Sequence, residues 1–216
     1  TGNLLHWMPH MCGGVVGLAD PQSGALSPFN VLGLVMGPIA QFKVEVFLNF
    51  FLGSLGFLIF CRTIGASPLF GVVGIVIWSG NGLVGTRILY GQTTFYPLFL
   101  LPVLVALLHK EGATKESVTR WPGSSNVAVG TIFTVLILLQ DGILVVIHSF
   151  PFLFLFAILL SKRSSFRPVT LFLLWCGLGF VVTLPRYLPV ALEMATTPRI
   201  VPSLEALSLA DFYRAF

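Results

Sequence analysis

Charged side chains are scarce in this sequence. Of its 216 residues only 9% are Asp, Glu, Lys or Arg, whereas 56% are hydrophobic, and the mean hydropathy is +0.93. A soluble domain carries about a quarter of its residues as charged side chains, so this composition excludes an ordinary water-soluble globule. It predicts an all-α protein, a polytopic bundle of transmembrane helices.

Several patterns that would indicate other kinds of chemistry are also missing. The three cysteines, Cys12, Cys61 and Cys176, are too widely spaced for a disulfide or ligand pattern. His6 and His10 are four residues apart, but a proline lies between them and no glutamate completes an H-E-x-x-H motif. No phosphate-cradling Walker motif or dinucleotide fingerprint is present. We therefore predict no metal site and no bound cofactor in this chain.

The two ends of the sequence lack the usual terminal features. The chain opens without Met, a basic n-region or a signal h-region, and it stops at residues 211–216 without a tail. We interpret both ends as cuts within a longer polypeptide.

Six apolar runs are candidate membrane spans. They are Val44–Cys61, Leu69–Gly85, Thr94–His109, Val127–Leu139, Ile143–Leu160 and Val169–Leu184. Several are shorter than the ~20 residues of a perpendicular span, and 127–139 is also compatible with a re-entrant hairpin formed with 143–160. The predicted organisation is a Gly/Pro-rich outer loop with an interfacial helix (1–42), a helical bundle of about six spans (43–184) and an extracytoplasmic segment (185–216).

Basic residues are divided unevenly between the two sets of loops. One set carries seven of them: Arg62, Lys110, Lys115, Arg120, Lys162, Arg163 and Arg167. The opposite set of inter-span loops carries only Lys43 and Arg87, while the longer tail beyond 184 counts for less. The positive-inside rule places the seven in the cytoplasm, and six of the eight acidic residues then fall on or beside the outer face. Topology thus explains the net charge of +4, and no nucleic-acid partner is predicted.

A series of distinctive short motifs begins near the N-terminus and continues along the chain. The motifs are Trp7-Met8-Pro9-His10, Gly13-Gly14, Ala19-Asp20-Pro21-Gln22, Ser27-Pro28-Phe29-Asn30, Tyr90-Gly91-Gln92, Asp141-Gly142 and Pro185-Arg186-Tyr187-Leu188-Pro189. Their order resembles that of GT-C type polytopic glycosyltransferases, particularly the bacterial YfhO-like branch, over nearly the whole chain. The likeness departs at Met8, where the family has Asn, and at Gln92, where it often has His.

The resemblance implies an enzyme of the bacterial inner membrane that works on its extracytoplasmic face. Such an enzyme moves a sugar from a polyprenyl-phosphate donor to a glycan, lipid or protein acceptor. The family places its main catalytic carboxylate in the first outer loop, soon after the first span. We expect this chain to begin downstream of that point and therefore to be inactive alone, and a divalent metal is left open for the full-length enzyme.

The expected chemistry selects candidate residues on the outer face. A carboxylate must activate the acceptor or hold a metal, for which Asp20 and Asp141 are the candidates. A cation must stabilise the leaving phosphate, and guanidinium groups match phosphate geometry, so Arg186 leads, ahead of Arg87 and Arg199. Aromatic and amide side chains would bind the sugar and the lipid, and the candidates are Trp7, His10 and Gln92.

Each candidate also has an ordinary structural explanation. An arginine at a span end commonly reaches toward lipid headgroups, and Asp before Pro or Gly commonly opens a turn. Glu45 lies one turn inside a span, where a carboxylate usually faces a partner or a cavity. His148 is predicted to hydrogen-bond a neighbouring helix.

Two further function classes remain open. Gly- and Pro-interrupted spans, as at Ser79-Gly80-Asn81-Gly82, are also typical of transporters and flippases, although no internal repeat is visible. A non-catalytic membrane subunit would use the same fold for assembly.

Overall fold

The computed structural model describes residues 26–80, 86, 93–113, 121–161 and 166–196. These residues form helices and turns, and no strand occurs among them. In chain order the elements are α1 (Asn30–Met36), α2 (Pro38–Thr63), α3 (Pro68–Ser79), the 3-10 helix η1 (Thr93–Leu100), α5 (Leu101–Ala113), α6 (Ser124–Leu139), α7 (Ile143–Leu160) and α8 (Arg167–Thr196). The predicted all-α class is confirmed.

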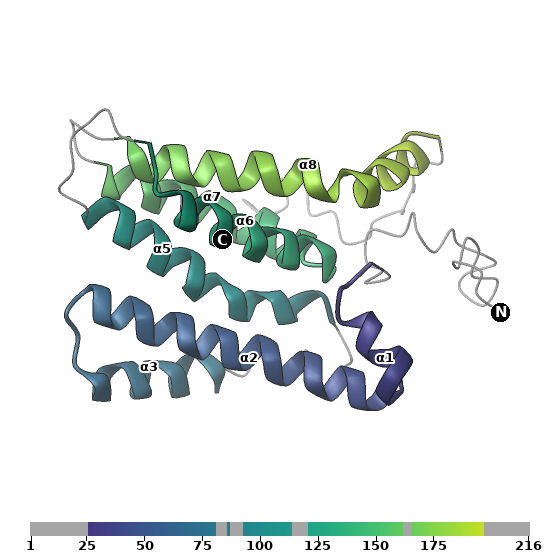
Figure 1. The fold of residues 1–216 in the computed structure, drawn as a ribbon, viewed down its shortest axis with the longest axis horizontal. Helices are drawn as coiled ribbons and strands as arrows, with labels where there is room; N and C mark the ends of the chain where they lie inside the picture. Colours follow the sequence, from purple (N-terminus) through teal and green to yellow (C-terminus); the bar gives the residue numbers. More distant parts are fainter. Residues whose placement is uncertain (1–25, 81–85, 87–92, 114–120, 162–165, 197–216) are drawn as a thin grey trace, which may run out of the picture.

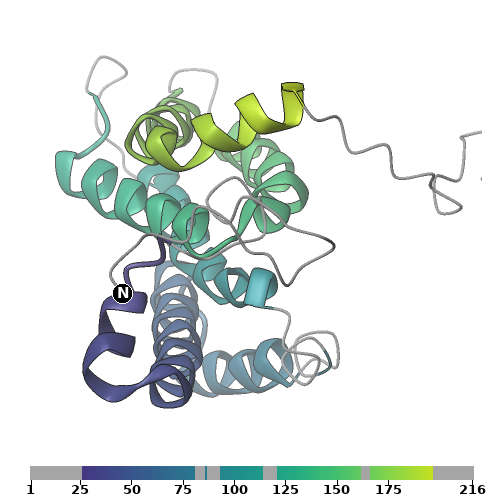
Figure 2. The ribbon, with the colours of Figure 1, turned by 90° about the vertical axis from the view of Figure 1, so that its right-hand side faces the viewer.

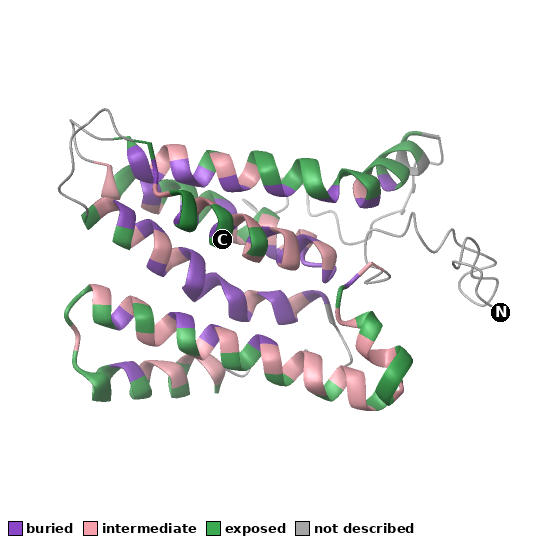
Figure 3. Cartoon of the chain, in the orientation of Figure 1, coloured by how far each residue is buried: buried purple, intermediate pink, exposed green. Residues whose placement is uncertain are grey.

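The long helices lie roughly parallel or antiparallel to one another (Figure 1). Helices α2 and α3 form one side of the bundle, α6, α7 and α8 form the other, and α5 runs between them (Figures 1 and 2). Side chains of α5 are buried along most of its length (Figure 3), among them Leu101, Leu104 and Leu108. Helix α5 is therefore the centre of the hydrophobic core.

Glycines set how closely α2 approaches this central helix. A Cβ atom at Gly53 would lie 2.0 Å from the carbonyl oxygen of Phe99, and one at Gly56 would lie 2.4 Å from the Val103 side chain. Helices in lipid gain little from the hydrophobic effect between them, so close backbone contact at small residues provides much of their attraction. Alanine at either position would force α2 and the η1–α5 segment apart.

Four helices are long and apolar enough to cross a membrane. Their spans are Pro38–Thr63, Thr94–Ala113, Ile143–Leu160 and Arg167–Leu192. Much of the outer surface is apolar, with residues such as Phe47, Ile77, Phe152 and Val181 exposed. An apolar exterior combined with helices of this length makes the chain an integral membrane protein.

The predicted count of about six spans is not reproduced. A described helix overlaps each of the six predicted runs, but α3 has only 12 residues and α6 only 16. An α-helix rises 1.5 Å per residue, so neither crosses the roughly 30 Å hydrocarbon layer alone. Among the described residues four membrane-length helices are present, with two shorter apolar helices packed beside them.

Two helix boundaries differ from those expected. Helix α2 already begins at Pro38, directly after Gly37, whose φ of 78° breaks the chain between α1 and α2. The last span was expected to end at Leu184, yet α8 continues through Pro185 and Pro189 to Thr196. Its final turns leave at an angle to the rest of the helix (Figure 2), as expected for a helix kinked by proline.

Three of the seven residues in the predicted basic set are described, and they lie at the same end of the bundle. The C-terminal ends of α2, α5 and α7 and the start of α8 lie at one end of the bundle (Figure 1). This basic end carries Arg62 and Lys110 in the last turns of α2 and α5, and Arg167 at the start of α8. The opposite end, called the polar end below, carries α1 and the turn between α6 and α7.

Candidate functional site

The α6–α7 turn brings Asp141 into the interior of the polar end. Helix α6 ends in a Schellman motif, in which the Gly142 N–H donates to the Ile137 carbonyl over 2.9 Å. Asp141 occupies the left-handed position with φ 70°, which Asp tolerates better than most residues. The carboxylate is only 2% exposed. A Cβ at position 142 would lie 2.4 Å from the Ile137 carbonyl oxygen, so this tight turn requires glycine.

Helix α8 supplies the residues that face this turn. Arg186 is 2% exposed, and the neighbouring Tyr187 hydroxyl donates to the Leu138 carbonyl over 2.8 Å. That carbonyl lies in the last turn of α6, where the regular i→i+4 hydrogen bonds of the helix end. Both Asp141 and Arg186 lie close enough to act electrostatically on the Tyr187 phenol. The Tyr187 phenol therefore lies within electrostatic range of both an acid and a cation.

A second set of polar side chains joins α2 to the same turn. Asn49 is fully buried, and its Nδ2 donates to the Gln140 Oε1 over 2.7 Å and to the Glu45 carbonyl over 2.9 Å. The Glu45 carboxylate accepts from Ser27 Oγ at 3.4 Å and from Gln41 Nε2 at 3.1 Å. The polar end thus contains a hydrogen-bonded network of amide side chains and the Glu45 carboxylate inside a largely apolar bundle.

Tyr187 also lines an apolar groove. It has a volume of about 1030 Å³ and runs between α6, α7 and α8. Tyr187 and Leu184 lie toward its polar-end side, and Phe150, Leu173 and Phe180 line it further along. A groove of this kind, apolar along its length with a phenol near one end, is suited to an amphiphile with a long hydrocarbon chain.

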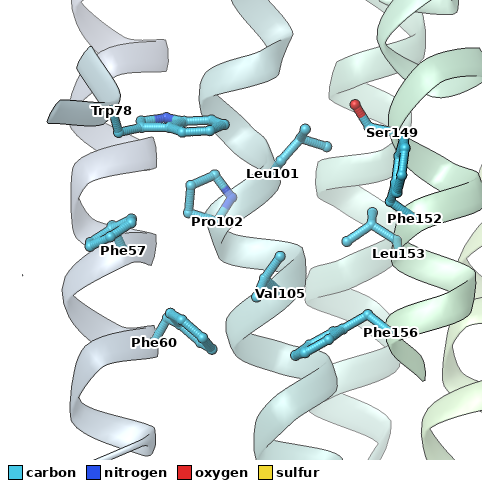
Figure 4. Close-up of a pocket in the computed structure, with 10 residues that line it drawn as sticks. All are labelled: Phe57, Phe60, Trp78, Leu101, Pro102, Val105, Ser149, Phe152, Leu153 and Phe156. Atoms are coloured by element: carbon cyan, nitrogen blue, oxygen red, sulfur yellow. The ribbon is translucent and has the colours of Figure 1, made fainter. Parts of the chain in front are cut away.

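A smaller groove of about 450 Å³ lies on the other side of α5. Phe57, Phe60 and Trp78 form one wall, α7 forms the other with Phe152 and Phe156, and α5 runs between them (Figure 4). None of the residues that line this smaller groove is charged.

The basic end holds a buried ion pair that the sequence did not indicate. Arg167 contacts Glu111 over 2.5 Å, and Asn126 Nδ2 donates to the same carboxylate over 2.7 Å. The Trp175 indole N–H donates to the Asn126 carbonyl over 3.1 Å. Glu111 lies beyond the predicted span Thr94–His109, yet it is 2% exposed in α5 and links α5, α6 and α8.

No match to this chain was found among protein-family models, curated proteins or solved structures. Within the described part of the chain, no group of three or more His, Cys, Asp or Glu side chains is placed to hold a metal ion.

The structure describes two of the eight candidate residues. Asp141 and Arg186 are both buried and within electrostatic range of Tyr187. The other six fall outside the described residues: Trp7, His10, Asp20, Arg87, Gln92 and Arg199. Arg186 belongs to a continuous helix, although the sequence suggested a helix end.

One prediction about another polar residue, His148, can be compared with the structure. The His148 prediction was wrong, because its Nδ1 lies 2.7 Å from the carbonyl of Leu144 in its own helix. The sequence analysis did not predict the hydrogen bond between Asn49 and Gln140. The signal that could have indicated it is a lone asparagine within the first predicted span.

Proposed function

We propose that this chain is part of an integral membrane glycosyltransferase of the GT-C type, which moves a sugar from a polyprenyl-phosphate donor to an extracytoplasmic acceptor. The observation that supports the proposal is that Tyr187 lines the large apolar groove and lies within electrostatic range of Asp141 and Arg186. A polyprenyl-phosphate donor has the matching form, a long apolar chain with a charged head. The motif order from Trp7 to Pro189 supports the same family.

In this proposal each group of the cluster has one role. The prenyl chain lies in the groove between α6, α7 and α8, and its phosphate reaches the Tyr187 end. Arg186, held in a region of low dielectric, stabilises the negative charge that develops on the leaving phosphate. Asp141 holds the guanidinium in place or accepts the acceptor's proton.

Arg186 provides the decisive test. The assay is sugar transfer from a polyprenyl-phosphate donor by membranes that carry the whole gene product at matched expression. Loss of one charge-assisted contact to the developing phosphate charge costs about 2–4 kcal/mol, so Arg186→Ala should lower the rate roughly thirty- to a thousandfold. Arg186→Lys should recover only part of this, since an ammonium keeps the charge but lacks the planar fork.

The control is Arg199→Ala, which removes an arginine of the same C-terminal segment and should cost less. Near wild-type turnover in Arg186→Ala would mean that this residue is a structural or headgroup contact and that the phosphate site lies elsewhere. A photoreactive polyprenyl phosphate gives a separate readout of the groove. It should crosslink to α6, α7 or α8 in the wild type, and excess unlabelled polyprenyl phosphate should compete.

One observation favours a second candidate, a transporter or flippase. The 3-10 helix η1 is eight residues long, whereas runs beyond three or four residues are uncommon and often mark functional irregularities. Transporters place ion and substrate sites beside such irregular helices. Flux of a polyprenyl-linked sugar across sealed liposomes, without sugar transfer, would favour this candidate over the enzyme.

A further inference from the structure

Glu45 is an ionisable side chain inside a membrane-length helix, outside the cluster of Asp141 and Arg186. It lies eight residues into α2 and is half-buried. Both of its described hydrogen-bond partners, Ser27 Oγ and Gln41 Nε2, are neutral. A carboxylate at such depth is costly and is normally balanced by a positive charge. The nearest basic residue in sequence, Lys43, is exposed.

Two neighbouring side chains have buried oxygens with no hydrogen-bond partner among the described residues. Asn49, one helical turn from Glu45, is 0% exposed, and its Oδ1 has no donor although its Nδ2 makes two bonds. The Tyr96 hydroxyl is likewise unpartnered in a residue 1% exposed, and its phenol lies within electrostatic range of the Glu45 carboxylate. Buried polar atoms are almost always bonded to something, so these oxygens point to a ligand.

The chemistry of these groups favours one kind of ligand. Carboxylate, amide carbonyl and phenol oxygens are hard ligands, which suit hard cations. A proton on Glu45 would serve a single acceptor, whereas an alkali cation is coordinated by several oxygens at once. Glu45 contributes one negative charge, and the carboxylate of Asp141 shares the surroundings of the Tyr187 phenol with the cation Arg186. One positive charge therefore balances the site.

We propose that Glu45, Asn49 and Tyr96 form a binding site for a single alkali cation between α2 and η1. Tyr96 reaches the site because η1 packs against α2, and its ring contacts Phe42 edge-on with 5.7 Å between centroids. Membrane proteins commonly coordinate sodium beside interrupted helices, and η1 is an interruption of this kind ahead of α5. The site stands independently of the proposed sugar transfer.

Carbodiimide labelling tests the site directly. Dicyclohexylcarbodiimide modifies membrane-embedded carboxyl groups, and a bound cation protects them. The purified protein in lipid vesicles is treated in sodium, potassium or choline chloride at equal ionic strength, and modification of the Glu45 peptide is measured by mass spectrometry. Labelling should be strong in choline and suppressed in a saturable manner by sodium or potassium. Labelling that depends on pH but is equal in all three salts overturns the proposal and assigns a proton instead.

Matched variants identify the ligands through the concentration of salt that gives half-protection. Tyr96→Phe keeps the ring and removes only the hydroxyl oxygen, so half-protection should require about tenfold more salt. Glu45→Gln should abolish binding of radioactive sodium or rubidium measured directly on vesicles. Lys43→Gln alters the charge on the same helix without touching the site and should behave like the wild type. Equal salt protection in wild type and Tyr96→Phe, or cation binding retained by Glu45→Gln, overturns the proposal.

Discussion

Replacing Glu111 with alanine removes the acid at the centre of the basic-end cluster. Its carboxylate contacts Arg167 over 2.5 Å and accepts from Asn126 Nδ2 over 2.7 Å, and both Glu111 and Arg167 are almost fully buried. Removal of one partner leaves a buried guanidinium without its counter-charge, which costs about 3–5 kcal/mol. This is a large part of the 5–15 kcal/mol that typically stabilises a folded protein.

The cost should appear as a lower midpoint of thermal unfolding. For a chain of this size each kcal/mol corresponds to about 2–4 °C, so Glu111→Ala should unfold roughly 6–20 °C below the wild type. Tryptophan fluorescence of the detergent-solubilised protein is a suitable signal, since the Trp175 indole is bonded to Asn126 within the same cluster. The same scan is run in lipid nanodiscs to exclude a detergent effect.

A double variant separates charge burial from packing. Glu111→Leu with Arg167→Met replaces the ion pair with apolar side chains of similar size, and such replacements are often neutral or stabilising by about 1–4 kcal/mol. The double variant should therefore unfold near or above the wild type, while each single variant unfolds well below it. A loss of less than about 1 kcal/mol in Glu111→Ala, the value typical of an exposed pair, would refute a buried ion pair at this position.

Three other outcomes are expected. In a cysteine-free background, single cysteines at Ser124 and Ser23 should react with an impermeant maleimide from opposite sides of sealed vesicles, and labelling from one side would contradict the topology. Gly130→Val should destabilise the α6–α8 contact by about 1–3 kcal/mol, since even a Cβ there would lie 2.0 Å from the Trp175 ring; an unchanged unfolding midpoint would contradict this contact. Tyr187→Phe should lower the free energy of unfolding by about 1 kcal/mol through loss of its 2.8 Å bond to the end of α6, and no measurable change would show that this bond is not stabilising.

Hydropathy determined that the chain is a helical membrane protein. Backbone N–H and C=O groups in lipid must bond within the chain, so long apolar segments become helices whatever their neighbours are. For the same reason a described helix overlaps each predicted apolar run. The length of each helix depended on tertiary structure instead: α8 is bent at its prolines and continues to Thr196, and α3 and α6 are too short to span alone.

The sequence also grouped Arg62, Lys110 and Arg167 on one side, because successive loops between spans lie on alternate sides of a membrane. These three residues lie at the basic end of the bundle. Motif order selected Asp141 and Arg186, and both are buried within electrostatic range of Tyr187. Sequence reasoning gave neither the Asn49–Gln140 bridge, across 91 residues, nor the pair of Glu111 with Arg167.

The physical reason lies in the helices themselves, which are apolar on nearly all faces. In a soluble protein the polar stripe of a helix shows which side faces the core, but here both lipid and protein interior accept the same side chains. The rotation and pairing of the helices are decided by close packing at small residues such as Gly53, Gly56 and Gly130. Which polar side chains meet follows from that packing, so only the tertiary structure could decide it.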